Sequence, residues 1–260
     1  RNLSRRIPIR GRGYTLAYQT CGPLACNMFA LVCDTTNEAA IIDPSSYTDV
    51  EFQNMQKHLE DKDVKHIFLT HGHCDHVAGL PKVVNIWPDA RLYLHDLEQE
   101  NYQSATKAGQ EFGIIINETL PEPTDSIQDG DYLTVGESIQ LRVVHTPGHS
   151  PGHVGFVDDR PNISISSSSH DSNNNGAVII GGDLLFRGTV GSATFLNSNF
   201  NDLMASVRRL YEEFDEESIV LSGHTTPTYL KTEAQQPVVS SSLKKSNKWF
   251  YEAKQKHGWN

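Results

Sequence analysis

Short apolar runs separated by polar turns dominate the chain and predict many buried strands. Residues 28–33, 39–42 and 64–70 are mostly apolar or β-branched, and polar residues bound each run. The same pattern predicts further strands at residues 91–94, 139–144, 154–157, 178–180 and 219–221. Apolar residues at helical spacing predict helices at residues 49–59, 78–84, 96–108 and 200–214. Strands and helices mixed in this order indicate a layered α/β domain in which helices cover packed sheets.

One polar segment interrupts this pattern. Residues 162–176 are rich in Ser and Asn and contain few side chains that build a core. We expect a flexible insertion here, and no catalytic role for His170 within it. Residues 1–230 are then expected to form one domain. Residues 231–260 would be a short C-terminal extension, helical around residues 242–256.

The composition narrows the classes of partner. With 22 Lys and Arg against 32 Asp and Glu, the formal net charge is -10. This argues against nucleic acid as the main partner, because phosphate binding needs a basic surface. No apolar run approaches the roughly 18 residues that span a bilayer, so we expect no membrane partner either. Four irregularly spaced cysteines without a C-x-x-C pair argue against a disulfide framework.

The start of the chain is strongly basic. Five arginines fall within the first 12 residues, and no acidic residue precedes Asp34. Such a start fits either the remnant of an organellar transit segment or a tail that flanks a strand, and we favour the tail. Since no secretory signal is visible, we expect the protein in the cytoplasm, with an organelle matrix as the alternative.

The most informative motif is His-Gly-His-Cys-Asp-His at residues 71–76, directly after an apolar run. His71 and His73 are two apart, so extended backbone directs both to the same side. Asp75 and His76 are adjacent and point elsewhere if the chain turns into a helix. One pair can then hold one metal while the other pair reaches a second. A polar loop that is merely rich in histidine does not account for four ligand side chains within six residues.

Three further candidate ligands also follow predicted strands. His149 lies in a Thr-Pro-Gly-His turn, and Asp183 and His224 each come directly after an apolar run. Rigid strands that end at one edge bring such side chains to one point. Nitrogen and carboxylate donors without a thiolate suit zinc, iron or manganese. The expected arrangement is His71, His73 and His149 for one metal, Asp75, His76 and His224 for the other, and Asp183 as a bridge.

These motifs occur in an order that resembles the metallo-β-lactamase superfamily of metallohydrolases, over about residues 30–233. The resemblance implies an αββα sandwich with a dinuclear site at one edge of the two sheets. Asp43, in Ile-Ile-Asp-Pro, matches the family's early acidic motif and would steady the metal ligands without binding metal. His153 is not a ligand in that pattern, and we expect it to support the ligands or simply to pack.

Residues 182–191 narrow the resemblance further. They are similar to the glyoxalase II group, the hydroxyacylglutathione hydrolases, and particularly to its short bacterial-type relatives. Asp75 in place of Glu disfavours the flavo-diiron proteins, and a bridging Asp183 disfavours true β-lactamases. The resemblance implies hydrolysis of the S-lactoylglutathione thioester with two divalent ions, zinc being favoured over iron or manganese. Asp75 and Asp183 are the expected catalytic residues, Asp75 to orient the attacking hydroxide and Asp183 to bridge.

The substrate contacts depart from the glyoxalase II pattern. Ser192 stands where that group has a basic residue, and Thr194 stands near where it has an aromatic one. The C-terminal segment is also short and basic. Arg187, Lys231 and Lys244 are therefore the candidates for binding the carboxylates of a glutathione-derived substrate.

Three other functions stay open from the sequence. A lactonase or another ester hydrolase would use the same site. A persulfide dioxygenase would use a mononuclear iron site of two His and one Asp, which the complete second triad disfavours. A metal-binding module without turnover is opposed by the retained ligand set, and an assay is needed to exclude it.

Overall fold

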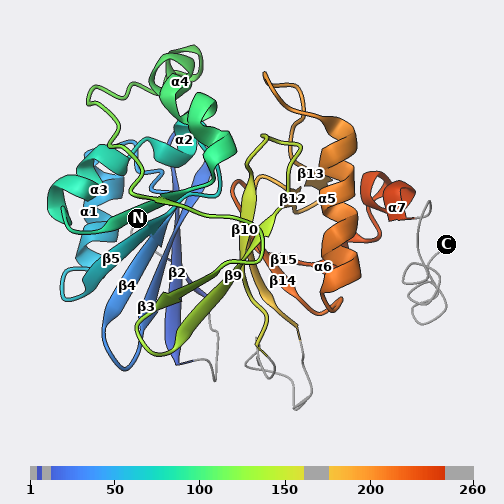
Figure 1. The fold of residues 1–260 in the computed structure, drawn as a ribbon, viewed down its shortest axis with the longest axis horizontal. Helices are drawn as coiled ribbons and strands as arrows, with labels where there is room; N and C mark the ends of the chain where they lie inside the picture. The colour runs from blue at the N-terminus through green and yellow to red at the C-terminus, as the bar shows by residue number, and fades with distance from the viewer. Residues whose placement is uncertain (1–4, 8–12, 161–175, 244–260) are drawn as a thin grey trace.

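Two β-sheets pack face to face in the computed structural model, which describes residues 5–7, 13–160 and 176–243 (Figure 1). The seven-stranded sheet follows the chain, in the order β1-β2-β3-β4-β5-β6-β7. Its strands are β1 (Arg5–Ile7), β2 (Tyr14–Cys21), β3 (Cys26–Cys33), β4 (Glu38–Ile42), β5 (Asp63–Phe68), β6 (Arg91–Leu94) and β7 (Asp125–Ser126). The β4-β5-β6-β7 pairings are parallel and the earlier ones antiparallel.

The second sheet has six strands in the order β15-β14-β11-β10-β9-β8. They are β8 (Tyr132–Val135), β9 (Ile139–His145), β10 (Val154–Asp158), β11 (Val178–Gly182), β14 (Ile219–Ser222) and β15 (Thr228–Tyr229). Only β11 and β14 pair in parallel, across a connection that contains the helix α5. The strands β12 (Leu185–Phe186) and β13 (Thr189–Val190) form a separate two-stranded ribbon.

Helices cover the outer face of each sheet, as Figure 1 shows. Outside the first sheet lie α1 (Asp49–His58), α2 (Cys74–Val77), α3 (Leu80–Ile86) and α4 (Gln99–Gly109). Outside the second lie α5 (Phe200–Glu213), α6 (Leu230–Glu233) and α7 (Pro237–Leu243). The short 3-10 turns η1 (Asp96–Glu98) and η2 (Gln110–Phe112) flank α4. The predicted αββα sandwich is confirmed.

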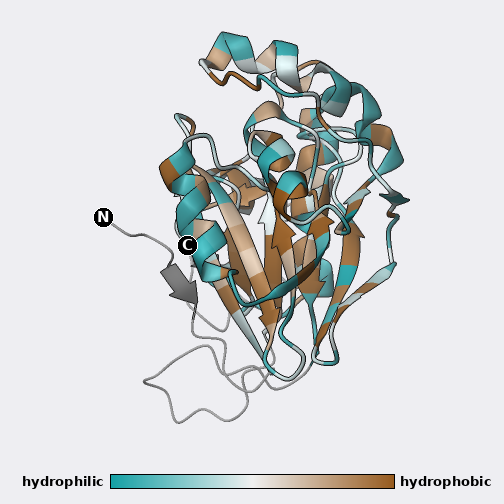
Figure 2. Ribbon diagram, turned by 90° about the vertical axis from the view of Figure 1, so that its left-hand side faces the viewer, coloured by the Kyte–Doolittle hydropathy of each residue, from teal (hydrophilic) through white to brown (hydrophobic). Residues whose placement is uncertain are grey.

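The apolar strands are buried because both of their faces are covered. Every residue of β3 is buried, and its side chains alternate between two cores. Phe29 and Leu31 pack between the sheets, whereas Met28 and Ala30 pack under the helices of the first sheet. Figure 2 shows the resulting distribution, with hydrophobic strands inside and hydrophilic stretches along the outer helices. A continuous apolar run, rather than strict alternation, is what such a doubly covered strand requires.

Local signals fix where two of the predicted helices begin. Thr48 and Glu51 form a capping box at α1, each side chain bonded to the other's backbone N–H. The side chain of Asn199 accepts hydrogen bonds from Asn201 and Asp202 at the start of α5. The helices predicted at residues 49–59 and 200–214 are therefore confirmed, within one residue at their C-terminal ends.

Other predicted elements differ in detail. The helix predicted at residues 78–84 is preceded by the separate one-turn helix α2, and the helix predicted at residues 96–108 begins as η1. The strand β2 was not predicted, because Tyr14–Cys21 carries Thr and Gln among its apolar positions. The predicted insertion at residues 162–176 and the helix at residues 242–256 lie almost wholly outside the described residues.

The segment after residue 230 packs on the second sheet's helix layer. Leu230, Ala234, Val239 and Leu243 are all fully buried in the core that α5 covers. Residues 231–243 thus share a core with the preceding strands. None of the described helices is long and apolar enough to cross a membrane.

Phe156 tests the core between the sheets. It is fully buried on β10, with its ring centroid 5.5 Å from that of Phe68 on the opposite sheet. We expect Phe156→Ala to lower the free energy of unfolding by about 3–5 kcal/mol, because the cavity lies where two sheets meet. The matched variant Phe200→Ala, at a side chain that is 53% exposed, should change it by less than about 0.5 kcal/mol. Urea unfolding of both metal-loaded variants compares them, and equal losses would contradict this packing.

Candidate metal centre

All seven predicted ligands meet at one edge of the sandwich, where strands of both sheets end. His71 and His73 follow β5, Asp75 and His76 lie in α2, and His149 lies in the turn between β9 and β10. Asp183 directly follows β11, and His224 follows β14. In sheets with parallel strands, this carboxyl-terminal edge is where loops can converge on a ligand.

The first cluster consists of three imidazoles. His73 Nδ1 lies 3.0 Å from His71 Nε2 and 2.9 Å from His149 Nε2. The three ligand nitrogens lie within 4.8 Å of one another. In a tetrahedral site with bonds of about 2.0–2.1 Å, nitrogens are roughly 3.3 Å apart. The cluster therefore has the dimensions of three of the four positions in a tetrahedral zinc or iron shell.

The second cluster combines imidazoles with carboxylates. His224 Nε2 lies 3.2 Å from Asp75 Oδ2 and 3.2 Å from Asp183 Oδ2. His76 Nε2 lies 3.3 Å from Asp183 Oδ1. Asp183 Oδ2 is also 3.5 Å from His149 Nε2 in the first cluster. The Asp183 carboxylate thus stands between the two clusters, with Oδ2 close to one ligand of each and Oδ1 close to His76.

Two buried atoms in this centre have no hydrogen-bond partner among the described residues, namely His76 Nε2 and Asp183 Oδ1. An unsatisfied buried polar atom costs about 1–3 kcal/mol. A divalent cation bound by imidazole nitrogen and carboxylate oxygen would remove this cost, since both atom types are metal donors. The residues present therefore fit a pair of divalent ions.

The protonation states suit the first cluster in particular. Burial, reinforced by His76, holds the pKa of His71 well below its usual value. Burial and the nearby His149 lower the pKa of His73 to about 3. Although burial opposes ionisation, His76 and His224 hold the pKa of Asp183 well below its usual value. Neutral imidazoles and an ionised carboxylate are the forms that bind metal.

Asp43 orients the ligands from the side away from the metals. Its fully buried carboxylate accepts hydrogen bonds from the backbone N–H and hydroxyl of Thr70, both at 2.7 Å, and lies 2.9 Å from His76 Nδ1. The Thr70 hydroxyl lies 3.0 Å from His71 Nδ1. These contacts leave the Nε2 atoms of both imidazoles directed to the metals.

Glu98 joins the two loops that carry the first cluster. Its buried carboxylate accepts hydrogen bonds from the backbone N–H of Gly72 at 2.9 Å and of Gly152 at 2.7 Å. His153 supports the bridging residue in a similar way, because its Nε2 accepts a hydrogen bond from the backbone N–H of Asp183 at 2.9 Å. His153 therefore contacts a ligand residue, as one of the two expectations for it stated.

Close backbone approach also requires glycine at the centre. A Cβ atom added at Gly223 would lie 2.1 Å from Asp183 Oδ1 and 2.9 Å from His76 Cε1. Any side chain at this position would therefore displace the Asp183 carboxylate and the His76 ring. Both residues of this Gly-His sequence thus serve the centre, because Gly223 leaves room for it and His224 lines it.

A cavity of about 600 Å³ opens onto the centre. It reaches His73, Asp75, His149, Asp183 and His224, and its outer wall includes the apolar side chains of Leu24, Phe112, Phe195 and Leu196. The ring centroid of Phe195 lies 5.1 Å from that of His73 and 5.6 Å from that of His149. The approach to the centre is therefore largely apolar and partly aromatic.

The candidate substrate contacts lie elsewhere or outside the described residues. Arg187 donates a hydrogen bond to the Pro227 carbonyl at 2.6 Å, and Lys231 forms an ion pair of 2.6 Å with Glu217. Neither residue lines the cavity. Lys244 lies outside the described residues, so its role stays a prediction. Lys107, which the sequence did not single out, is the one lysine or arginine among the described residues that line the cavity.

Sequence reasoning also missed residues that reach the centre only through the fold. Phe195 lies one position beyond Thr194, where an aromatic residue was expected and not found. The thiol of Cys26 joins Asp75, His76 and His224 in a group whose donor atoms all lie within 4.8 Å of one another. The sequence predicts no thiolate among the ligands, whereas the fold brings Cys26, the first residue of β3, next to them.

Comparison with known proteins agrees with this geometry. Residues 21–166 match the sequence profile of the metallo-beta-lactamase superfamily. The hydroxyacylglutathione hydrolase GloC of Haemophilus influenzae is 27% identical over 210 residues, which cover 78% of this chain and 88% of that protein.

Two solved structures share the fold across most of their length. The crystal structure of TTHA1623 in a di-iron-bound form has a TM-score of 0.67 and 31% identity, covering 84% of this chain and 97% of that one. The BLEG-1 B3 metallo-beta-lactamase has a TM-score of 0.69 and 27% identity, covering 86% and 99% respectively. The matches agree with the two packed sheets and with the edge at which the donor clusters meet. The chain therefore belongs to the metallo-beta-lactamase superfamily, whose fold binds divalent metal ions.

Proposed function

We propose that this protein is a dinuclear metal-dependent hydrolase that cleaves a thioester, with S-lactoylglutathione as its substrate and lactate and glutathione as products. The observation that carries the proposal is the position of Asp183 between two complete donor clusters. His71, His73 and His149 would hold one ion, Asp75, His76 and His224 the other, and Asp183 both. GloC supports the choice of substrate, because that relative is named as a hydroxyacylglutathione hydrolase.

Two divalent ions supply, when bound, a water that ionises near neutral pH and positive charge for the carbonyl oxygen of the substrate. Asp75 lines the cavity, and its pKa is lowered because His76 and the hydrogen bond from His224 outweigh the effect of burial. It is therefore ionised and able to orient the water and accept its proton. Phe195 lines the cavity and packs against the rings of His73 and His149.

The leaving group explains why the site needs no strong acid. Attack forms a carbon–oxygen bond at the thioester carbonyl, and collapse breaks the carbon–sulfur bond and releases a thiolate. A thiol has a pKa near 8.5, so its anion leaves without prior protonation. An amide would instead require protonation of the departing nitrogen, which makes it the harder substrate for a site of this kind.

Zinc is the proposed metal, with iron and manganese as alternatives. Imidazole and carboxylate donors suit all three ions. The relative TTHA1623 was solved in a di-iron-bound form, which supports iron as the first alternative. A persulfide dioxygenase would need a single iron, and the second donor cluster argues against that function.

The cavity wall favours a second candidate, hydrolysis of lactones or aliphatic esters. Leu24, Phe112, Phe195 and Leu196 give the cavity an apolar entrance, whereas glutathione carries two carboxylates and one ammonium group. Lys107 offers one cationic contact, with Glu100 and Glu111 nearby on the same wall. An apolar acyl chain would bury surface there without needing further charges.

The direct test is hydrolysis of S-D-lactoylglutathione by zinc-loaded protein, followed as loss of thioester absorbance. We expect turnover in the wild type, and Asp183→Ala should lower kcat/KM by at least about 100-fold. Substitutions that touch only the supports of metal ligands already cost roughly 10- to 100-fold, so loss of the bridge should cost at least as much.

Metal content and a second substrate decide what a negative result means. Wild type that holds two zinc ions but leaves S-lactoylglutathione intact would contradict the glutathione assignment. Turnover of γ-lactones by the same preparation would then support the second candidate. Absence of hydrolysis with every ester and thioester, in fully loaded protein, would contradict a hydrolase altogether.

The apolar wall gives a further prediction. Phe195→Ala should lower kcat/KM roughly tenfold for the substrate that the protein turns over, mainly through KM, because about 1–2 kcal/mol of apolar contact is lost. Zinc content should stay at the wild-type level, since Phe195 supplies no donor atom. The control is Phe200→Ala, whose side chain does not line the cavity. Equal effects of the two variants on kcat/KM would show that Phe195 does not contact substrate.

A further inference from the structure

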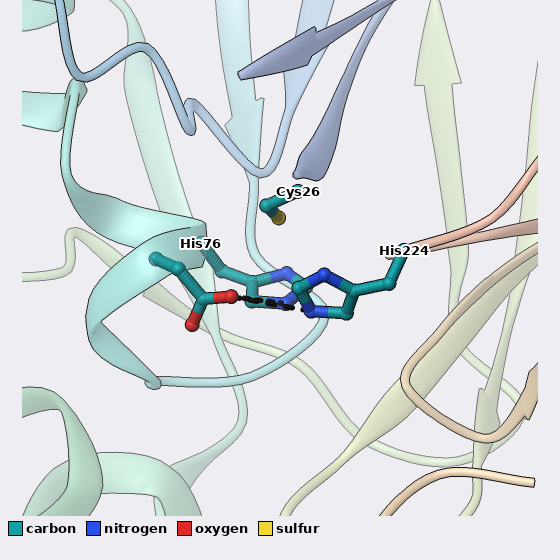
Figure 3. A group of neighbouring side chains, drawn as sticks. Cys26, His76 and His224 are labelled. Atoms are coloured by element: carbon teal, nitrogen blue, oxygen red, sulfur yellow. Dashed lines mark ion pairs between the residues drawn. The ribbon is translucent and has the colours of Figure 1, made fainter. Parts of the chain in front are cut away.

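One thiol lies against the second metal cluster although no sequence motif includes it. Cys26 is the first residue of β3 and is 1% exposed. Its sulfur, Asp75, His76 and His224 offer donor atoms that all lie within 4.8 Å of one another. Figure 3 shows the Cys26 side chain directed toward the rings of His76 and His224.

The fold holds Cys26 in this position through its neighbours. The backbone N–H of Asn27 donates to the Gly223 carbonyl at 2.6 Å, and the Asn27 side chain donates to the carbonyls of Ser222 and Thr225. From the other side, His224 Nδ1 lies 2.9 Å from the Leu24 carbonyl. The start of β3 and the loop that carries His224 are thus bonded to each other on both sides of the thiol.

A second observation concerns His76, one of whose ring nitrogens has no hydrogen bond within the part of the chain that the structure describes. His76 is fully buried, and its Nε2 has no hydrogen-bond partner among the described residues. Its nearest carboxylate oxygens lie 3.3 Å away on Asp183 and 3.8 Å away on Asp75. Asp43 already occupies the Nδ1 atom of the same ring. The free nitrogen and the Cys26 sulfur therefore belong to the same group of potential ligands.

We propose that Cys26 binds the second metal ion as a thiolate, beside Asp75, His76, His224 and the bridging Asp183. This rests on the two-ion centre of the proposed function and adds a soft ligand to it. A thiol bound to a divalent ion loses its proton, which passes to solvent when the ion enters. The Ser45 hydroxyl lies 3.0 Å from the sulfur and 2.7 Å from the Asp43 carbonyl oxygen, so it can donate to either acceptor.

The position of Cys26 excludes a role as a nucleophile toward substrate. It is absent from the residues that line the cavity, whereas Cys74 lines it. Cys74 is also buried and adjacent to a ligand, yet its sulfur belongs to none of the donor groups among the described residues. Cys74 therefore provides a matched control for Cys26. The proposed ligand should shift the preference of the second site toward Zn²⁺ and Cd²⁺ and away from Mn²⁺.

Titration with Co²⁺ tests the proposal without reference to activity. A thiolate bound to Co²⁺ gives a near-ultraviolet charge-transfer band, which nitrogen and oxygen ligands do not give. We expect this band in the wild type with two Co²⁺ bound, its retention in Cys74→Ser and its loss in Cys26→Ser. The affinity for one of the two ions should also fall about 10- to 100-fold in Cys26→Ser.

Any other result overturns the proposal. The number of bound Co²⁺ ions then shows whether the two-ion centre of the proposed function fails as well. Two bound Co²⁺ without the band, or a band that persists in Cys26→Ser, would show that Cys26 only packs, while the two-ion centre stands. Fewer than two bound Co²⁺ without the band would contradict that centre as well. If Cys26→Ser does not fold, X-ray absorption of zinc-loaded wild type and Cys74→Ser decides. A sulfur neighbour at about 2.3 Å is expected in both, and its absence would overturn the proposal.

Discussion

Seven predicted metal ligands, five of them buried and two partly buried, meet at one edge of two packed sheets, and the rest of the structure depends on this constraint. His76 Nε2 and Asp183 Oδ1 are buried there without hydrogen-bond partners. The other ring nitrogen of His76, Nδ1, lies 2.9 Å from the Asp43 carboxylate, which also accepts hydrogen bonds from Thr70. Divalent cations bound here would satisfy His76 Nε2 and Asp183 Oδ1, so metal binding should stabilise this edge of the fold.

Side chains from other elements of the sandwich hold the ligand loops in place. Glu98 binds backbone groups of two ligand loops, and Asn27 binds the loop of His224. Both side chains come from elements outside those loops. Ligands from both sheets are therefore fixed relative to one another before any ion binds, which keeps the energetic cost of ordering low. The same convergence leaves one open side, and the apolar wall around Phe195 and Leu196 determines what can enter it.

Much of this could be predicted from sequence. The order of the apolar runs gave the layered fold, and all seven predicted ligands meet, because each follows a strand that ends at the same edge. Contacts made only through tertiary structure could not be predicted. Cys26 lies about fifty residues before Asp75, and nothing near it signals a metal. The charges of Arg187 and Lys231 predict contacts with substrate carboxylates, yet these side chains bond Pro227 and Glu217 instead. Lys107 and Phe195 line the cavity instead, because α4 and the segment before α5 form its wall.

The central claim is that Asp183 joins two separate ion sites. Anomalous diffraction from zinc-loaded crystals, recorded on both sides of the zinc absorption edge, tests it most directly. We expect two peaks per chain, one bounded by His71, His73 and His149 and the other by Asp75, His76 and His224, with Asp183 between them. A single peak, or a second peak away from Asp183, would contradict the claim.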